Sequence, residues 1–254
     1  MDGKRETAPY EASRAKSQAA GFETTHWSMV LQASHRSSSG SDKALSELCH
    51  SYWLPLYAYV RRRVQDPHKA QDLTQAFFAK LLEKNYLRTA DPARGRFRAF
   101  LLTALKRFMA NEWDKEIAQK RGGGRNPLSF DFKEGERHYH LEPTDRLTPD
   151  QLFLRNWVRT LLDKVFDRLR EEFKTEGKEE QFSELRVFIT PREDDVRFAE
   201  VATRLEMSAG AVRVAAHRLR KRYRKILREE ISQTVENEDE VEDEIRSLFR
   251  AFDE

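Results

Sequence analysis

The sequence predicts an all-α protein with two small helical domains joined by a flexible linker. Apolar residues recur every three or four positions over most of the chain, which is the period of a helix with one buried face. The stretch 121–150 breaks this period with three consecutive glycines and three prolines, which is typical of a linker. We find no sustained alternation of the kind that predicts strands.

The composition excludes several classes of protein. Of 254 residues, 35% are charged and 39% hydrophobic, which suits several small helical units better than one thick core. Cys49 is the only cysteine, so an internal disulfide and a cysteine-based zinc cluster are both excluded. No apolar run reaches the length of a membrane span, and the N-terminus lacks the apolar stretch of a signal peptide. We therefore expect a soluble, cytoplasmic protein without a membrane partner.

We expect a disordered N-terminus at residues 1–20, where small and charged residues dominate, and a first domain at 21–120. Pro55 interrupts the second helix of this domain and predicts a kink or a boundary there. Asp66 precedes Pro67, a pair that commonly begins a helix. The helices expected in this domain span residues 24–31, 43–64, 67–82 and 97–120, with a loop at 84–96.

After the linker, we expect a second domain at 151–230 and an acidic extension at 231–254. From Glu229 to the end, the chain contains eleven acidic and two basic residues. Apolar positions in this extension still keep a helical period, which predicts a short amphipathic helix. The remaining elements expected here are a helix at 152–173, a polar turn at 176–180, a short helix at 182–189, a loop at 191–195 and the extension's helix from Val241 to Phe252.

The segment 198–227 predicts a short helix, a tight turn and a longer basic helix. Ser208 stands where its hydroxyl can cap the second helix. The turn position that glycine usually fills is Glu206, and a non-glycine residue there costs about 1 kcal/mol. One face of the longer helix is apolar (Val212, Ala216, Leu219, Tyr223, Ile226) and another is cationic (Arg213, His217, Arg220, Arg224).

An apolar stripe beside a cationic face suits a helix that packs on the protein and presents charge to duplex DNA. The same pattern also occurs in basic helices that face solvent or bind a partner protein, so this alternative stays open. Net charge does not decide between them, because the overall value of +3 hides the contrast between the basic helix and the acidic extension.

Three segments resemble conserved regions of bacterial RNA polymerase sigma factors. Residues 70–82, AQDLTQAFFAKLL, resemble region 2.2; residues 97–112, FRAFLLTALKRFMANE, resemble regions 2.3 and 2.4; and residues 198–227 resemble region 4.2. Because no substantial domain separates the two units, the chain is similar to the compact extracytoplasmic-function (ECF) type. The resemblance covers residues 24–230.

The resemblance implies a subunit that binds core RNA polymerase through its β′ and β subunits and recognises the −10 and −35 elements of promoter DNA. It also implies that the protein opens the duplex for transcription initiation, uses no cofactor and catalyses no reaction of its own. A separate anti-sigma factor is a further candidate partner.

In the family, the region 2.2 helix docks on a coiled coil of the polymerase β′ subunit. The residues that match this surface are Asp72, Leu73, Gln75 and Phe78. The alternative interpretation is an acid near a helix N-terminus and an aromatic residue in the core.

The resemblance places −10 contacts on residues 84–96 and the following helix, and −35 contacts on the N-terminal part of the basic helix. Most aromatic residues after position 96 keep the buried stripe, so we expect them in the core. Relatives often carry a basic residue where Ala215 stands, so one groove contact is missing here. The residues implied for the −10 element are Arg94, Arg96, Arg98, Lys106, Arg107, Asn111 and Lys115, and those for the −35 element are Ser208, Ala211, Arg213, Val214, His217 and Arg218.

Three other classes remain as alternatives. An enzyme is disfavoured because the chain has no Walker loop, GxSxG or HExxH motif, and His138 and His140 lack a clear third metal ligand. A stand-alone helix-turn-helix regulator would not need the Asp72–Gln75 motif, and an anti-sigma or scaffold protein would not need the basic helix. For the acidic extension we hypothesise that it folds back on the basic helix and restrains DNA binding; the alternative is a solubilising helix.

Overall fold

The computed structural model of the chain describes residues 30, 41–83, 86–91, 95–118, 130–141, 146–190, 195–235 and 237–253. All regular elements in these ranges are helices, which confirms the all-α prediction. The N-terminal segment 1–20, the glycine-rich residues 122–124 and, apart from Val30, the expected helix 24–31 lie outside the described residues.

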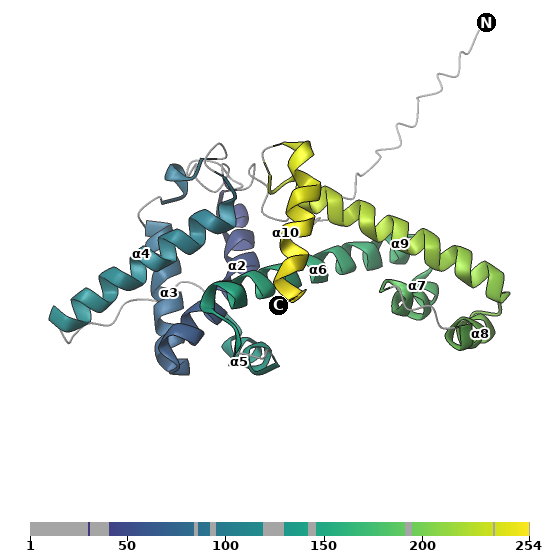
Figure 1. The fold of residues 1–254 in the computed structure, drawn as a ribbon, viewed down its shortest axis with the longest axis horizontal. Helices are drawn as coiled ribbons and strands as arrows, with labels where there is room; N and C mark the ends of the chain where they lie inside the picture. The colour runs from purple at the N-terminus through teal and green to yellow at the C-terminus, as the bar shows by residue number, and fades with distance from the viewer. Residues whose placement is uncertain are drawn as a thin grey trace, which may run out of the picture.

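The helices of the first group lie together (Figure 1), and each contributes apolar side chains to a shared core. The helix predicted at 43–64 was expected to kink or to end at Pro55. The predicted end is wrong, because α2 continues through this proline, which is buried. The lost backbone hydrogen bond is offset by burial of the apolar face of α2 on both sides of the proline. The elements of this group are α2 (Ser41–Val64), α3 (Pro67–Glu83), the 3-10 helix η1 (Tyr86–Thr89) within the expected loop, and α4 (Phe97–Ala118).

Cys49 lies in this core and is 1% exposed. Burial raises the pKa of its thiol to about 12, so the group stays protonated near neutral pH. Asp66 begins α3 as expected, because its Oδ1 accepts hydrogen bonds from the backbone N–H groups of His68 at 2.8 Å and Lys69 at 3.1 Å.

The predicted linker contains a helix, α5 (Phe132–Leu141), which the sequence interpretation did not include. It packs on α2 where Gly135 approaches Trp53 and Tyr57 so closely that a Cβ atom would lie 3.0 Å and 3.1 Å from their rings. Glu136 accepts hydrogen bonds from Tyr57 and, at 2.8 Å, from Arg61 Nε. The apolar period of α5 was not recognised in the sequence, because the helix is short, its exposed face is polar and it lies within a glycine- and proline-rich stretch.

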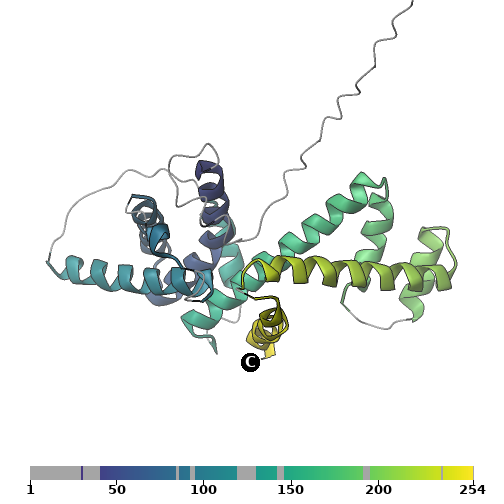
Figure 2. The same cartoon turned by 90° about the horizontal axis from the view of Figure 1, so that it is seen from above.

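Helix α6 (Pro149–Thr175) connects the two ends of the molecule. It begins with a capping box in which Gln151 N donates to Thr148 Oγ1 at 3.2 Å and Thr148 N donates to Gln151 Oε1 at 2.8 Å. It packs on α2 and buries Phe153, Trp157 and Leu161 in its N-terminal half, and its C-terminal half lies against α9 (Figure 2). The two predicted domains are therefore in contact, while their boundaries stay a prediction.

The C-terminal part of the chain forms the expected short helix, turn and longer basic helix, and a further helix. The short helix expected at 182–189 is confirmed, as an α-helix that continues into a 3-10 turn. Figure 1 shows α10 lying across α6, between the two ends of the molecule. The elements are α7 (Glu179–Leu185), η4 (Arg186–Phe188), α8 (Asp195–Arg204), α9 (Ala209–Ser232), η5 (Glu238–Glu240) and α10 (Val241–Asp253).

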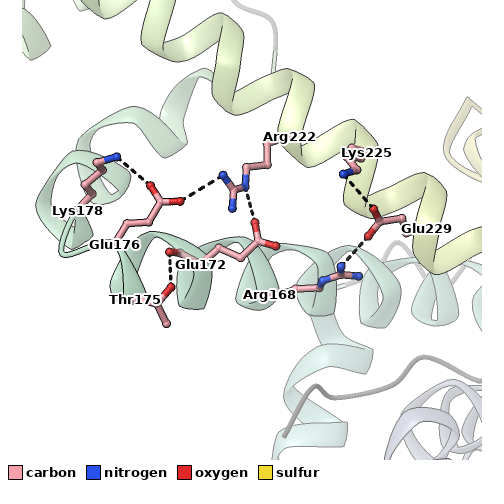
Figure 3. Close-up of polar contacts among 8 residues, drawn as sticks. All are labelled: Arg168, Glu172, Thr175, Glu176, Lys178, Arg222, Lys225 and Glu229. Atoms are coloured by element: carbon pink, nitrogen blue, oxygen red, sulfur yellow. Dashed lines mark hydrogen bonds and ion pairs between the residues drawn. The ribbon is translucent and has the colours of Figure 1, made fainter. Parts of the chain in front are cut away.

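A seam of ion pairs holds α9 against α6 (Figure 3). Arg222 Nε lies 2.5 Å from Glu172 Oε2, and its Nη1 lies 3.3 Å from Glu176 Oε1. Closer to the centre of the molecule, Arg168 Nη2 lies 2.6 Å from Glu229 Oε2. These contacts fix the helix-turn-helix on a helix that also packs on α2. Among the described helices, none combines the length and apolar character needed to cross a membrane.

Candidate nucleic-acid interface

The turn between α8 and α9 is closed in the left-handed form that glycine usually adopts, although Glu206 stands at that position. Glu206 has φ +52°, the left-handed conformation expected at this position. Met207 N donates to Ala202 O at 2.9 Å and Glu206 N donates to Thr203 O at 3.3 Å, which is the pair of bonds that closes a Schellman motif. Ser208 Oγ then accepts from Ala211 N at 3.2 Å, which confirms the predicted cap.

Helix α9 separates its apolar and cationic residues onto different faces. Val212, Ala216 and Leu219 are at most 1% exposed, and Ile226 is also buried. Tyr223 is half-buried at the edge of the stripe. The exposed face on the opposite side carries Val214, His217, Arg218, Lys221 and Arg224.

Five of the six residues implied for the −35 element are exposed, at the N-terminal end of α9: Ser208, Arg213, Val214, His217 and Arg218. Ala211 is half-buried. The guanidinium of Arg213 lies 5.3 Å from the centre of the Phe198 ring on α8, which restricts its motion. The structure thus brings these residues together on one accessible surface, and their contact with DNA stays a prediction.

The C-terminal half of α9 holds cations of a second kind, which pair within the protein. Besides the Arg222 pairs with α6, Lys225 Nζ lies 3.7 Å from Glu229 Oε1, and Arg228 pairs with Glu242 of α10. The sequence alone did not distinguish these paired cations from the exposed cations of α9, because their acidic partners lie in other helices or one turn later in α9.

The residues implied for polymerase binding divide into two pairs on α3. Asp72 is exposed and Gln75, one turn later, is half-buried. Leu73 and Phe78 are 8% and 1% exposed, and the Phe78 ring lies 5.1 Å from that of Phe130. In this structure Phe78 is a core residue, as the alternative interpretation had it, so only the polar pair faces outward.

The residues implied for the −10 element are distributed over α4 and the segment before it. Arg107 and Asn111 lie four residues apart on α4 and are exposed. Lys106 is also exposed, with its Nζ 2.5 Å from Asp150 Oδ1 and 5.8 Å from the centre of the Tyr59 ring. Arg94 and the side chain of Lys115 lie outside the described part of the chain.

The other two residues of this set, Arg96 and Arg98, are paired with Glu244 of α10. Glu244 Oε1 accepts a hydrogen bond from Arg98 Nη1, and its Oε2 lies 2.5 Å from Arg96 Nη2. The Arg98 guanidinium also lies 4.8 Å from the centre of the Trp157 ring on α6. The side chain of Glu244 is fully buried and that of Arg98 is 9% exposed, so Arg98 is inaccessible to DNA in this conformation.

The sequence interpretation missed Glu244, because nothing local distinguishes it from the other acids of the extension. Its position did carry a signal: Val241, Glu244 and Leu248 share one face of the predicted amphipathic helix, so an acid stands in an otherwise apolar stripe. An acid in such a stripe requires a cationic partner on the surface that the helix covers.

His138 and His140, considered as metal ligands, instead pair with acids of α5. His138 Nε2 lies 2.8 Å from Glu134 Oε1 and His140 Nε2 lies 3.4 Å from Glu136 Oε2. Within the described ranges, no three His, Cys, Asp or Glu side chains are grouped so that they could hold a metal ion.

Comparison with known proteins gives one family match. No curated protein and no solved structure matches the chain. Residues 48–117, which span most of α2, α3 and nearly all of α4, match the family model of sigma-70 region 2. The helices that carry Asp72, Gln75, Arg107 and Asn111 therefore lie within the stretch that is similar to sigma-70 region 2, and the match supports a sigma-70 family factor. Members of that family are non-enzymatic factors of transcription initiation.

Proposed function

We propose that this protein is a sigma factor of the ECF type, which binds core polymerase, recognises the −10 and −35 elements and promotes duplex opening. The observation that carries the proposal is the match of residues 48–117 to sigma-70 region 2, in a chain that also contains a capped helix-turn-helix with an exposed cationic face. We place the protein in the cytoplasm, where core polymerase works, and an anti-sigma factor remains a candidate partner.

Each part of the proposed interface has a physical role. Asp72 and Gln75 present an acid and an amide on α3, which suits a polar contact with the polymerase β′ coiled coil. Arg107 and Asn111 hold the opened strand through its phosphates and base edges. The N-terminal residues of α9 enter the major groove, where Arg213 or Arg218 binds guanine or a phosphate.

In vitro transcription with purified bacterial core polymerase and genomic fragments tests this proposal. We expect specific transcripts that require the protein, and we expect Asp72→Ala/Gln75→Ala to reduce them at least tenfold because core capture is weakened. Competition between the variant and wild type for a limiting amount of core separates capture from DNA binding.

A matched control removes two exposed acids elsewhere, Glu179→Ala/Glu180→Ala on α7. This variant should support wild-type transcription, since α7 is outside the proposed polymerase surface. Binding of the wild-type protein to DNA without capture of core or new transcripts would instead establish the stand-alone helix-turn-helix regulator.

A further inference from the structure

Helix α10 covers the N-terminal end of α4, where the chain enters the proposed −10 surface. Val241 and Leu248 anchor it, since each is 1% exposed, and Glu244 lies between them on the same face. α10 packs on α6 and α9, and Figure 1 shows it crossing α6 at the middle of the molecule. The extension therefore folds back on α6 and α9, and it reaches the N-terminal end of α4 through Glu244. The exposed face of α9 with Arg218, Lys221 and Arg224 stays open.

The carboxylate of Glu244 occupies the position at which a DNA phosphate would pair with Arg96 and Arg98. A carboxylate and a phosphate both accept charge-assisted hydrogen bonds from guanidinium groups. Arg98 Nη1 donates to one oxygen of Glu244, and Arg96 forms an ion pair with the other. While α10 is docked, neither arginine is available in full to a nucleic acid, and Arg98 is covered by Trp157 as well.

The buried carboxylate is also the weak point of the docked helix. A fully buried acid is tolerated only while its cationic partners remain in place. A polyanion that competes for Arg96 and Arg98 removes those partners and exposes the carboxylate to repulsion. Among the described side chains of α10, the other anchors are the buried Val241 and Leu248, the half-buried Ile245 and the exposed Glu242–Arg228 pair.

We infer that α10 is an intramolecular cap on the −10 surface, held by Glu244, which nucleic acid must displace before Arg96 and Arg98 bind phosphates. This inference rests on the proposed function for the role of the surface, and it adds a regulatory step: the free protein binds DNA more weakly than the same protein with α10 released.

The first test measures α10 docking in the free full-length protein, without DNA or polymerase. Glu244→Gln keeps the shape of the side chain and removes its charge, and we expect hydrogen exchange of the amides in residues 241–253 to accelerate at least tenfold. The matched control is Asp243→Asn, which loses the same charge at a neighbouring side chain that is 73% exposed. Exchange in the control should stay at the wild-type rate.

The second test measures binding to a short duplex of arbitrary sequence with a central unpaired bubble. Glu244→Gln should bind about tenfold more tightly than Asp243→Asn, and log K against log salt should steepen by about 1 to 2 because two more phosphates are neutralised. Leu248→Ala, which removes an apolar anchor and leaves the charge unchanged, should act in the same direction.

Several results would overturn the cap. One is equal DNA affinity in Glu244→Gln and Asp243→Asn, since net charge alone would then explain any gain. Another is unchanged exchange and affinity in both Glu244→Gln and Leu248→Ala, and a third is weaker binding when α10 is released. None of these depends on core capture, so failure of the sigma assignment in transcription assays would be recognised separately.

Discussion

Cations in the two halves of the candidate interface are held in different ways. In the stretch that matches sigma-70 region 2, Arg98 is buried and bound to Glu244, and Arg96 shares the same carboxylate. At the N-terminal end of α9, Arg218 is exposed and projects from a helix whose opposite face is buried. Both arginines match DNA-binding positions of the family, yet only Arg218 is accessible. The role of a basic residue in this chain therefore depends on which acid the fold brings to it.

The largest effect that separates the two halves is expected from matched arginine substitutions. Arg98→Ala leaves the buried Glu244 with one partner and removes the contact with Trp157, so we expect a loss of about 3 kcal/mol in the free energy of unfolding. Arg218→Ala should change it by less than about 0.5 kcal/mol, because the side chain is exposed. Urea denaturation followed by circular dichroism measures both.

In DNA binding, we expect Arg218→Ala to have an effect that it does not have on stability. Arg218→Ala should lower affinity for a promoter duplex and reduce the slope of log K against log salt by about 1, the effect of one lost phosphate contact. A large loss of stability in Arg218→Ala, or no loss in Arg98→Ala, would contradict the distinction between the buried, paired Arg98 and the exposed Arg218.

A smaller effect compares the two helix caps at the start of α3 and α9. Ser208→Ala should cost about 1 kcal/mol of unfolding free energy at any pH, because a hydroxyl accepts the bond. Asp66→Ala should cost stability only when Asp66 is ionised. Hydrogen bonds from the backbone of Lys69 and then of His68 lower the pKa of Asp66 below 3.8, even though burial acts in the opposite direction.

The sign of this pH dependence follows from the lowered pKa. The stabilisation by Asp66 is complete above its unfolded-state value of 3.8 and is lost as pH falls through the lower value of the folded state. The difference between wild type and Asp66→Ala should therefore shrink below pH 3.8, while that for Ser208→Ala persists. Chemical denaturation at neutral and acidic pH shows whether the two caps differ in this way.

The elements that the sequence predicted are those with long apolar periods or local caps. Helix α4 begins at Phe97 and ends within two residues of the expected position, and Ser208 caps α9 through a bond three residues away. Such features depend on neighbours in sequence, so periodicity and residue type suffice. The buried positions of α9 were predictable for the same reason.

The features that were missed depend on partners far away in the chain. Arg98 and Glu244 are 146 residues apart, so no local pattern could join them. Helix α5 was hidden because Gly135, which normally weakens a helix, is needed for its close approach to Trp53. Pro55 shows the converse case, since a strong local breaking signal was overcome by burial of α2 along both halves.

The smallest effect concerns two helix ends that adopt the left-handed conformation without glycine. Gln65, between α2 and α3, has φ +63°, and Glu206, between α8 and α9, has φ +52°. Glycine relieves a strain of about 1 kcal/mol at such a position and loses part of that gain to its greater freedom when unfolded. We therefore expect Gln65→Gly and Glu206→Gly each to stabilise the protein by about 0.5 kcal/mol.

DNA affinity then separates the two turns. Gln65→Gly should leave it unchanged, since this turn lies outside the proposed DNA surface. If Glu206→Gly stabilises the fold and also leaves affinity unchanged, the strain at Glu206 has no functional role. If Glu206→Gly stabilises the fold but weakens DNA binding, the strained turn sets the orientation in which α9 meets the groove. The exposed cations of α9 would then depend on backbone geometry as strictly as Arg96 and Arg98 depend on Glu244.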